Sequence, residues 1–382
     1  MSDWQREFLP KEKGMETEAV RDVASYIERV NAYIRRRREN GSLFVYRGEP
    51  EIYENPCRPN IFRRGVLNGN DFFEKSLFDA MRQNRLTGEN RYLENAIDAQ
   101  HGEFPSRLLD VSYNCLTALY FAVTPYYHEK ETSKDDRDGM VYLFFLDEIF
   151  SPSAENTNRA YEAVINRKPE WYQKNTLFEK NYKFIDHAKL NNRIIAQQGA
   201  FILFPGQEQG SLPEYMYCGI RIAGEAKPRI RQQLKTLFGI HTGSIYPEII
   251  NLVEELNEKS RRLNTQPFTC ENEWDGVLHH LEKELVFYLN YTIEQKAEEA
   301  VWMQGPILLH VERIIDDWRR GMVEFLQNYR EDREKGRDTY IEKEKLIARI
   351  DRYNSLVDRF ARQFTQYTGI AVSWEEMKIP VR

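Results

Sequence analysis

The chain has 382 residues, of which 41% are hydrophobic and 30% are charged, and its formal net charge is −6. This balance is typical of a folded protein with a sizeable core and argues against an intrinsically disordered chain. The acidic net charge provides no global attraction for nucleic acid, although a local basic patch is compatible with it. The length predicts one large domain or two of ordinary size.

The cysteines and the lengths of the apolar runs bear on metal binding and on the compartment in which the protein works. Cys57, Cys115, Cys218 and Cys270 show no CxxC spacing, so we expect no thiolate zinc site. We expect His279-His280, on the helical part of the chain, to be a solvated pair rather than metal ligands, and we expect no metal elsewhere in the chain. The first residues lack the apolar core of a signal peptide, and no run of about 18 apolar residues would span a membrane. We therefore expect a cytoplasmic protein whose cysteines stay reduced.

Helical and strand-like patterns alternate through the N-terminal part of the chain. Residues 17–38 carry apolar residues at steps of three and four, which predicts a helix. It ends in four arginines at 35–38, where cations meet the negative end of the helix dipole. We expect these arginines to be solvated, with phosphate binding as the less favoured alternative. Residues 43–46 form a short apolar run bounded by Gly41 and Gly48, which predicts a buried strand.

Further along, residues 70–98, 112–124 and 228–238 have helical patterns, and the last of these has Gly239 just after its end. Strands are expected at 140–146, 200–204 and 215–223, where apolar residues form runs or alternate. Because both kinds of segment interleave, we expect an α+β domain with a small mixed β-sheet core and flanking helices.

The pattern changes after about residue 250, where nearly every segment has a helical period. One apolar stripe comprises Leu346, Ile350, Tyr353, Val357, Phe360, Phe364 and Tyr367, and another comprises Val311, Ile314, Trp318, Met322, Phe325 and Tyr329. Their alternating steps of four and three predict an antiparallel, coiled-coil-like hairpin within an all-α region. We therefore expect an N-terminal helix within residues 1–40, a core domain at 41–255 and a helical domain at 256–382 that binds a partner or self-associates.

The end of the first predicted strand, Tyr46-Arg47-Gly48, is the first candidate site. A guanidinium at such a position is costly to bury unless an anion meets it. The glycine permits a sharp turn or the close approach of a ligand. Arg47 is therefore either a ligand-binding residue or the partner of a core carboxylate, and the residues alone favour neither.

The segment Gln100–Asp110 is the second candidate, because it is polar and yet leads directly into an apolar helix. Such a segment must satisfy many hydrogen bonds at the boundary of the core, as structural networks and active sites both do. Its candidate site residues are Gln100, His101, Ser106, Arg107 and Asp110. Asp110 also stands where a helix N-cap is expected, and Arg107 and Asp110 could form an internal ion pair.

A third candidate precedes the strand predicted at 200–204. The amides of Gln197 and Gln198 lie beside Gly199, with Arg193 just upstream, and they can either read the polar edge of a ligand or tie down a loop. Other motifs are missing from the sequence. Without a GxSxG elbow Ser106 is a poor hydrolase nucleophile, and neither a Walker A loop nor a GxGxxG turn occurs.

Together these segments resemble an FRG domain. Tyr46-Arg47-Gly48 corresponds to the Phe-Arg-Gly that names the family, and residues 59–63 resemble the element that follows it. Gln100-His101 and the segment 105–110 resemble the family's Gln-His and Pro-Thr-Arg-Leu-Leu-Asp. The resemblance continues through Asn114, residues 118–122, Gln197, Gly199 and Phe201, and it covers about residues 20–255. Tyr46 and Ser106 replace the usual Phe and Thr, and Gly102-Glu103 departs from the family's aromatic residue followed by glycine.

The first motif is also similar to that of arginine-type ADP-ribosyltransferases, in which the arginine contacts the phosphates and ribose of NAD. This resemblance implies NAD as the ligand and Arg47, His101, Ser106 and Asp110 as catalytic residues. It further implies that NAD is bound by Tyr46, Arg47, Gly48, Gln100, Arg107 and Gln197. Those enzymes have a glutamate near a late strand, where this chain has Gln197-Gln198. The acid would therefore be Asp110 or Glu208.

The resemblance favours an NAD-using transferase or glycohydrolase, a toxin or defence effector whose target is a protein or a nucleic acid. One alternative is a non-catalytic ligand-sensing module whose helical half transmits a signal or recruits a partner. A second is a metal-independent nuclease that uses His101 with Arg47 and Arg107. The acidic net charge makes the nuclease the less favoured of the two.

Overall fold

The structure, a computed structural model, describes residues 18–37, 43–63, 73–86, 91–101, 104–126, 129–166, 176–186, 192–206, 212–297 and 304–380. The chain divides into two compact units, residues 1–261 and 262–382. The boundary expected after residue 255 falls within helix α12 (Ile249–Arg262). Among the described residues, no helix is long and apolar enough to cross a membrane.

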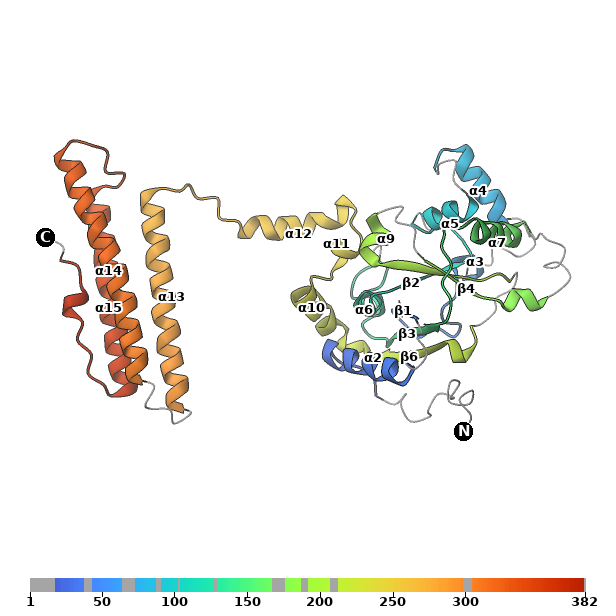
Figure 1. Ribbon diagram of the computed structural model, residues 1–382, viewed down its shortest axis with the longest axis horizontal. Coiled ribbons are helices and arrows are strands. Elements are labelled where there is room, and N and C mark those ends of the chain that lie inside the picture. The colour runs from blue at the N-terminus through green and yellow to red at the C-terminus, as the bar shows by residue number, and fades with distance from the viewer. Residues whose placement is uncertain are drawn as a thin grey trace. The chain divides into compact units, whose positions relative to one another are not determined.

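Unit 1 is built on a six-stranded sheet (Figure 1). Its strands are β1 (Leu43–Glu49), β2 (Leu108–Ser112), β3 (Gly139–Leu146), β4 (Lys183–Ile185), β5 (Gly199–Leu203) and β6 (Tyr217–Ile222). They lie in the order β4-β5-β2-β1-β3-β6, and every ladder between them is antiparallel. The α+β class is thus confirmed. The sheet is antiparallel rather than mixed, and parallel pairing within the described residues is limited to two isolated bridges, at Val20 and at Phe150.

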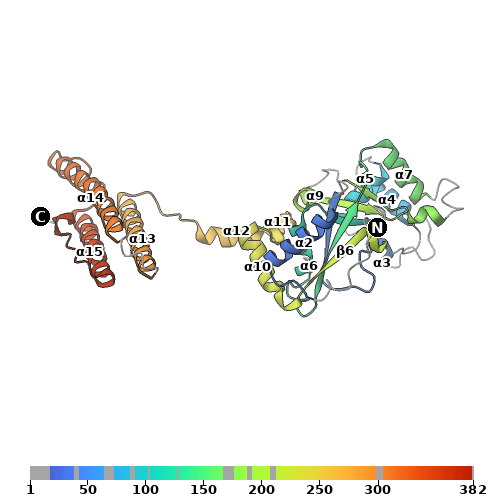
Figure 2. The ribbon, with the colours of Figure 1, turned by 60° about the horizontal axis from the view of Figure 1, so that its bottom comes forward.

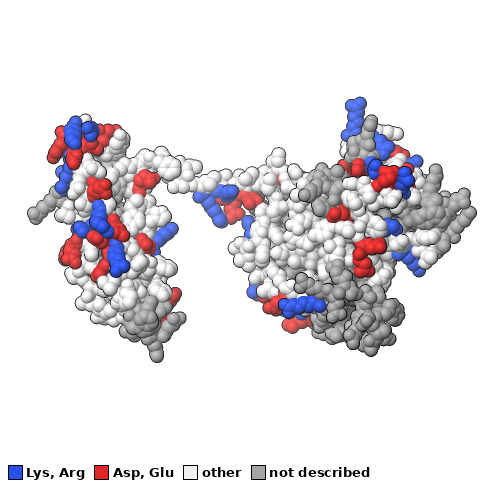
Figure 3. Space-filling model, viewed as in Figure 1, with Lys and Arg blue, Asp and Glu red and all other residues white. Residues whose placement is uncertain are grey.

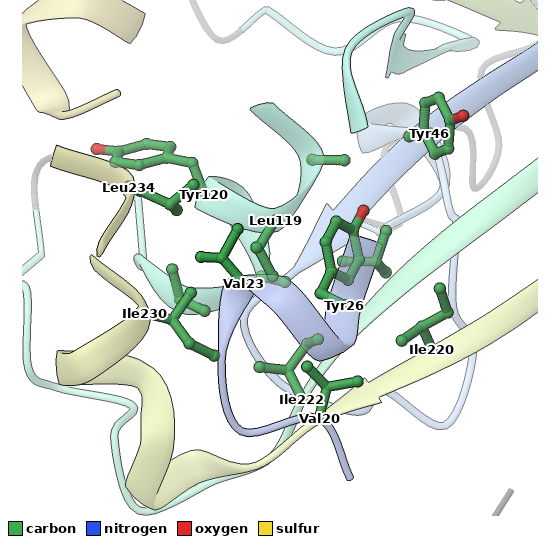
Figure 4. Packing of buried hydrophobic residues seen from close by; sticks show 14 of the residues in the cluster. Val20, Val23, Tyr26, Tyr46, Leu119, Tyr120, Ile220, Ile222, Ile230 and Leu234 are labelled. Atoms are coloured by element: carbon green, nitrogen blue, oxygen red, sulfur yellow. The ribbon is translucent and has the colours of Figure 1, made fainter. Parts of the chain in front are cut away.

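One group of helices covers the β1-β3-β6 part of the sheet. It comprises α2 (Val23–Arg37), α6 (Cys115–Val123) and α10 (Lys227–Phe238). Figure 4 shows how their apolar side chains meet those of the strands: Val23 and Tyr26 from α2, Leu119 from α6, Ile230 from α10 and Ile220 from β6. Burial of such side chains contributes about 1.5–3 kcal/mol each, so this cluster anchors β1 from one side.

A second group comprises α4 (Phe73–Gln83), α5 (Tyr92–His101) and α7 (Glu155–Ile165), and it packs against Leu108 of β2 and Phe201 of β5. Side chains two apart on a strand share a face, so Leu108 and Ser112 point the same way. Ser112 is paired with Tyr46, whose ring belongs to the first group's core. Both helix groups therefore lie on one face of the sheet, and they are visibly separate in Figures 1 and 2.

The opposite face of the sheet is covered mainly by loops. Val45, Leu109, Tyr142, Phe144 and Ile202 form its strand side. The short helix α3 (Asn60–Arg63) adds Ile61 and Phe62 to this cluster, and Leu212 joins it from the segment before β6. The central strands are therefore buried from both sides.

The boundaries of several elements differ from the sequence-based prediction. The helix expected at 70–98 is two helices, α4 and α5. Residues 108–112 form β2, which was not anticipated, and α6 begins only at Cys115. Its N-cap is Asn114, whose Oδ1 accepts from the backbone N–H of Leu116 at 2.9 Å, so capping by Asp110 was wrong. The end of α10 was predicted correctly, because Gly239 adopts the left-handed conformation with φ 65°.

Unit 2 contains the three long helices α13 (Cys270–Ala297), α14 (Gln304–Glu334) and α15 (Lys343–Thr368). The predicted seam of α15 is buried from Leu346 to Phe364. Its closest packing partner is α13 rather than α14, so the expected hairpin is one part of a three-helix bundle. The hydroxyl of Tyr353 still joins α15 to α14 by donating to the carbonyl of Ile315 at 3.3 Å.

Candidate functional site

A pocket of about 360 Å³ opens in unit 1 where β1 and β2 meet. Its polar lining includes the cations Arg47, Lys134 and Arg193, the carboxylates Asp110 and Glu129, and the amides Asn60, Gln100 and Gln197. Its aromatic lining includes Tyr46, Tyr53, Phe121, Tyr126 and Tyr246. This volume lies at the lower end of the range of small-molecule sites, about 300–1,000 Å³.

The sheet itself explains why a pocket forms at this point. β1 and β2 share one directly partnered pair, Tyr46 with Ser112, whereas β1 pairs with β3 over its full length. The two helix groups meet the sheet on either side of this junction, so the space above it is left open. Gly48 brings β1 close to α6, since a Cβ atom there would lie 1.8 Å from the carbonyl oxygen of Ala118.

Arg47 crosses the junction between the two strands. Its Nη1 donates to the carbonyl oxygen of Asp110 at 2.8 Å, and its Nε donates to Oε1 of Glu49 at 3.2 Å. Burial opposes the positive charge, but nearby negative charge, above all that of Glu49, raises the pKa of Arg47. The guanidinium is therefore a fixed cation in the pocket wall, and its side chain is 18% exposed.

Ser112 is a pocket residue that the sequence analysis missed. Its hydroxyl donates to the carbonyl oxygen of Gln197 at 2.7 Å and accepts from the backbone N–H of Asn114 at 3.0 Å. The hydrogen bond to Gln197 fixes the end of β2 to the segment that enters β5. In a strand, Leu108, Asp110 and Ser112 share one face, so recognising residues 108–112 as a strand would have placed Ser112 beside Asp110. That strand was not predicted from the sequence.

Aromatic rings and a second arginine form another part of the wall. Arg193, on α9 (Asn192–Gln197), lies over the ring of Tyr246 with its guanidinium carbon 4.5 Å from the ring centre. Phe121 and Tyr126 meet Tyr246 edge to face, with ring centres 6.2 and 6.4 Å away. Burial raises the pKa of Tyr246 far above its ordinary value, so its hydroxyl stays neutral. A stacked cation and aromatic faces suit a flat, anionic ligand.

A lysine completes the polar wall. The Nζ of Lys134 donates to Oε1 of Glu51 at 2.6 Å and lies 5.8 Å from the ring centre of Tyr53. The hydrogen bond from Lys134 lowers the pKa of Glu51 to about 2, so this carboxylate stays charged over the physiological range. Glu51 therefore holds the lysine side chain in place.

Two predicted site residues lie outside the pocket lining. Ser106 is fully buried, and its hydroxyl accepts from Nε2 of Gln100 at 2.8 Å and from the backbone N–H of Leu108 at 3.2 Å. Arg107 is 1% exposed and pairs with Glu74 instead of Asp110. Both residues are committed to internal contacts, so the catalytic role expected of Ser106 and the binding role expected of Arg107 find no support in their positions.

The remaining candidates divide into two sets. Tyr46, Arg47, Gly48, Gln100, Asp110 and Gln197 all line the pocket. Nε2 of Gln197 donates to the carbonyl oxygen of Ile245 at 3.2 Å, and Asp110 is exposed on β2. The side chain of His101 and the whole of Glu208 lie outside the described residues. Within the described part of the chain, no group of three His, Cys, Asp or Glu side chains is placed to hold a metal ion.

The comparison with known protein families matches the segment that contains β1 and β2, the two strands at the pocket. The family model of the FRG domain matches residues 42–131. The chain carries an FRG domain. The matched segment runs from β1 through β2 and α6 and contains Arg47, Asp110 and Ser112. Arg193, Gln197 and Tyr246 lie beyond it, so part of the pocket wall is supplied by residues outside the FRG match. The comparisons with curated proteins and with solved structures found no match.

Proposed function

We propose that this pocket binds NAD and that the chain transfers the ADP-ribose part of NAD to water or to a macromolecular acceptor. The observation that carries the proposal is the convergence of Arg47, Asp110 and Ser112 on one pocket at the junction of β1 and β2. A fixed guanidinium and a carboxylate then line the same space, where the first can hold phosphate oxygens and the second can stabilise the charge that develops when a nucleotide's glycosidic bond is cleaved.

The composition of the wall fits both parts of such a ligand. Arg47, Lys134 and Arg193 provide three cations for the diphosphate, and a planar guanidinium matches phosphate oxygens in pairs. Tyr246 and its aromatic neighbours provide faces and edges for a flat ring. The amides of Gln100 and Gln197 supply groups that can orient hydroxyls. Nε2 of Gln100 already donates to Ser106 and to the carbonyl of Leu108, so the group of this side chain that we assign to a ligand is its carbonyl oxygen.

Asp110 is the carboxylate that we assign to the chemistry. In the transfer, the bond between nicotinamide and ribose C1′ breaks, and nicotinamide leaves with the electron pair. A new bond forms from C1′ to the acceptor, which gives up a proton. A carboxylate beside C1′ stabilises the positive charge that develops on the ribose and can receive this proton.

A non-catalytic ligand sensor is the second candidate, and one observation favours it. Gln197, Gln198 and Gly199 occupy the entry to β5, where the resemblance to ADP-ribosyltransferases calls for a glutamate. The nuclease hypothesis loses support, because Arg107 is buried in an ion pair. On the face seen in Figure 3, the described basic side chains are also interspersed with acidic ones.

Calorimetry with NAD and a chromatographic assay for released nicotinamide test the proposal on the full chain. We expect wild type to bind NAD and to release nicotinamide. Asp110→Asn should retain binding and lose release by about 100-fold or more, since the group that stabilises the developing charge is gone. Arg47→Lys keeps a charge beside Glu49 but loses the planar fork, and should weaken binding by about tenfold.

Matched controls separate the site from general effects. Arg221→Lys changes an exposed arginine on β6 that pairs with Asp138 outside the pocket, and Asp316→Asn changes a surface carboxylate in unit 2. Both should behave as wild type. NAD that binds without turnover under any condition would favour the sensor. A wild-type chain that neither binds NAD nor releases nicotinamide would overturn the proposal.

A further inference from the structure

Unit 2 contains an apolar groove between α13 and α14 that its own helices leave open. The groove has a volume of about 530 Å³ and is lined by Trp274 and Val277 from α13 and by Trp318, Met322 and Phe325 from α14. Trp274 and Met322 are 6% and 4% exposed, whereas Trp318 and Phe325 are half-buried and form the accessible wall. Trp274 and Phe325 meet edge to face with ring centres 5.2 Å apart, which fixes the shape of one end.

A glycine in the middle of α14 marks the side on which the groove opens. Gly321 lines the groove, and apart from its chain neighbours and the backbone of its own helix no described heavy atom lies within 4 Å of the position that its Cβ would occupy. Glycine in a helix interior costs about 1 kcal/mol relative to alanine, and no described neighbour requires the small residue. The glycine thus leaves the backbone of α14 accessible to close approach from outside the bundle.

The charged residues of the groove define its electrostatic character. Among the described residues that line the groove, the acidic ones are Glu273 and Asp317, and none is a lysine or an arginine. Asp317 pairs with Arg320 on the exposed surface, where such pairs contribute little. Glu273 makes no ion pair within the described part of the chain. A second copy of this face would bring acidic groups together, so like-charge repulsion disfavours a symmetric dimer.

We propose that this groove binds an amphipathic helix of another protein, with an apolar stripe flanked by lysine or arginine. The groove between two helices takes an apolar helix face, and the two tryptophans supply the large rigid contacts that dominate such interfaces. Gly321 lets the incoming helix approach α14 closely. Glu273 and Asp317 then meet basic residues beside the stripe. The proposal concerns unit 2 alone and is independent of the NAD pocket.

The test uses the full chain and a fluorescein-labelled synthetic helix of about 18 residues, which is about 27 Å long. Leucines at helical spacing form its stripe, and lysines fill the remaining positions. A second peptide carries glutamate in place of every lysine. Fluorescence anisotropy should show saturable binding of the lysine peptide to wild type and at least about tenfold weaker binding of the glutamate peptide.

Two glycine variants provide a matched pair. Gly321→Phe fills the groove and should weaken binding of the lysine peptide by at least about tenfold. Gly276→Phe makes the same change at another exposed helical glycine with open space around its Cβ, outside the groove lining, and should bind as wild type. A double variant, Glu273→Gln with Asp317→Asn, leaves the apolar wall intact and should weaken binding of the lysine peptide only. Circular dichroism checks that each variant is folded.

Several outcomes would overturn the proposal. These are no saturable binding of the lysine peptide to wild type, equal binding by Gly321→Phe, or equal affinity for the two peptides. Analytical ultracentrifugation of wild type tests whether a second copy of the chain occupies the groove instead. A dimer that Gly321→Phe dissociates would assign the groove to a second copy of the chain and would also overturn the proposal.

Discussion

Arg107 and Glu74 form an ion pair that is almost completely shielded from water. Nε of Arg107 lies 2.5 Å from Oε2 of Glu74, and the two side chains are 1% and 2% exposed. The hydroxyl of Tyr161 donates to Oε1 of Glu74 at 2.6 Å. Nη1 of Arg107 donates to the carbonyls of Phe204, Pro205 and Gly206, at 3.0–3.4 Å. The pair thus connects α4, α7 and the end of β5 to β2.

Arg107→Ala should destabilise the fold severely. Its removal leaves the carboxylate of Glu74 buried without a countercharge, which costs about 3–5 kcal/mol of unfolding free energy. Urea denaturation measures this loss. Arg159→Ala removes an exposed pair with Glu155, whose side chains are 72% and 56% exposed, and should change stability by less than about 0.5 kcal/mol. If Arg107→Ala instead lost nicotinamide release at unchanged stability, Arg107 would belong to the site.

Gly48→Ala should be among the most damaging single changes in β1. The added methyl group would lie 1.8 Å from the carbonyl oxygen of Ala118, so β1 and α6 must separate. We expect a loss of at least about 3 kcal/mol of unfolding free energy, or insoluble protein. Gly199→Ala is the control on β5, because its nearest contact would be 3.8 Å, and it should cost less than about 1 kcal/mol. Equal stability of the two variants would contradict the close contact between β1 and α6.

Ser112→Ala and Ser106→Ala compare a serine that lines the pocket with a buried serine that does not. Each removes a buried hydroxyl and should cost about 1–3 kcal/mol of unfolding free energy. Ser112→Ala also removes the hydrogen bond from β2 to the carbonyl of Gln197, which lines the pocket, so the dissociation constant for NAD should rise about tenfold. Ser106→Ala should change it by less than about twofold, since Gln100 keeps its 2.6 Å hydrogen bond to Leu108. Calorimetry measures both dissociation constants. A larger increase for Ser106→Ala than for Ser112→Ala would mean that Ser106 belongs to the binding site.

Lys227 should make the stability of the fold depend on pH in the alkaline range. Its Nζ donates to the carbonyls of Pro50 and Lys134, both at 2.6 Å, and burial lowers its pKa from 10.5 to about 8. Below pH 8 the amine is charged in the folded and unfolded chains, and the folded chain bears the cost of burying that charge. Between pH 8 and 10.5 only the unfolded chain keeps the proton, so a rise in pH favours the folded state.

The measurement compares wild type with Lys227→Met by urea denaturation at several pH values. Other groups titrate alike in both proteins, so the difference in unfolding free energy isolates Lys227. This difference should grow in favour of wild type by up to about 3 kcal/mol as the pH rises from 8 to 10.5. A difference that stays constant with pH would mean that the pKa of Lys227 is not lowered.

The sequence by itself determined several of the local elements and the presence of the FRG domain. Apolar periodicity predicted α15 and its buried seam, and Gly239 correctly marked the end of α10, since both depend on neighbours within a turn or two. The motif at Tyr46-Arg47-Gly48 pointed to the strand that lines the pocket. Such features depend on residues that are close in the sequence, so they can be predicted without knowing which distant residues are in contact.

Only the tertiary structure decided which polar residues share the pocket. Ser106, Arg107 and Asp110 are close in sequence, yet the first two turn inward to Gln100 and Glu74 while Asp110 faces the pocket. Ser112 became a candidate only through its pairing with Tyr46 and its hydrogen bond to Gln197. The direction of a side chain on a strand depends on which strands lie beside it, and that pairing joins residues far apart in the chain.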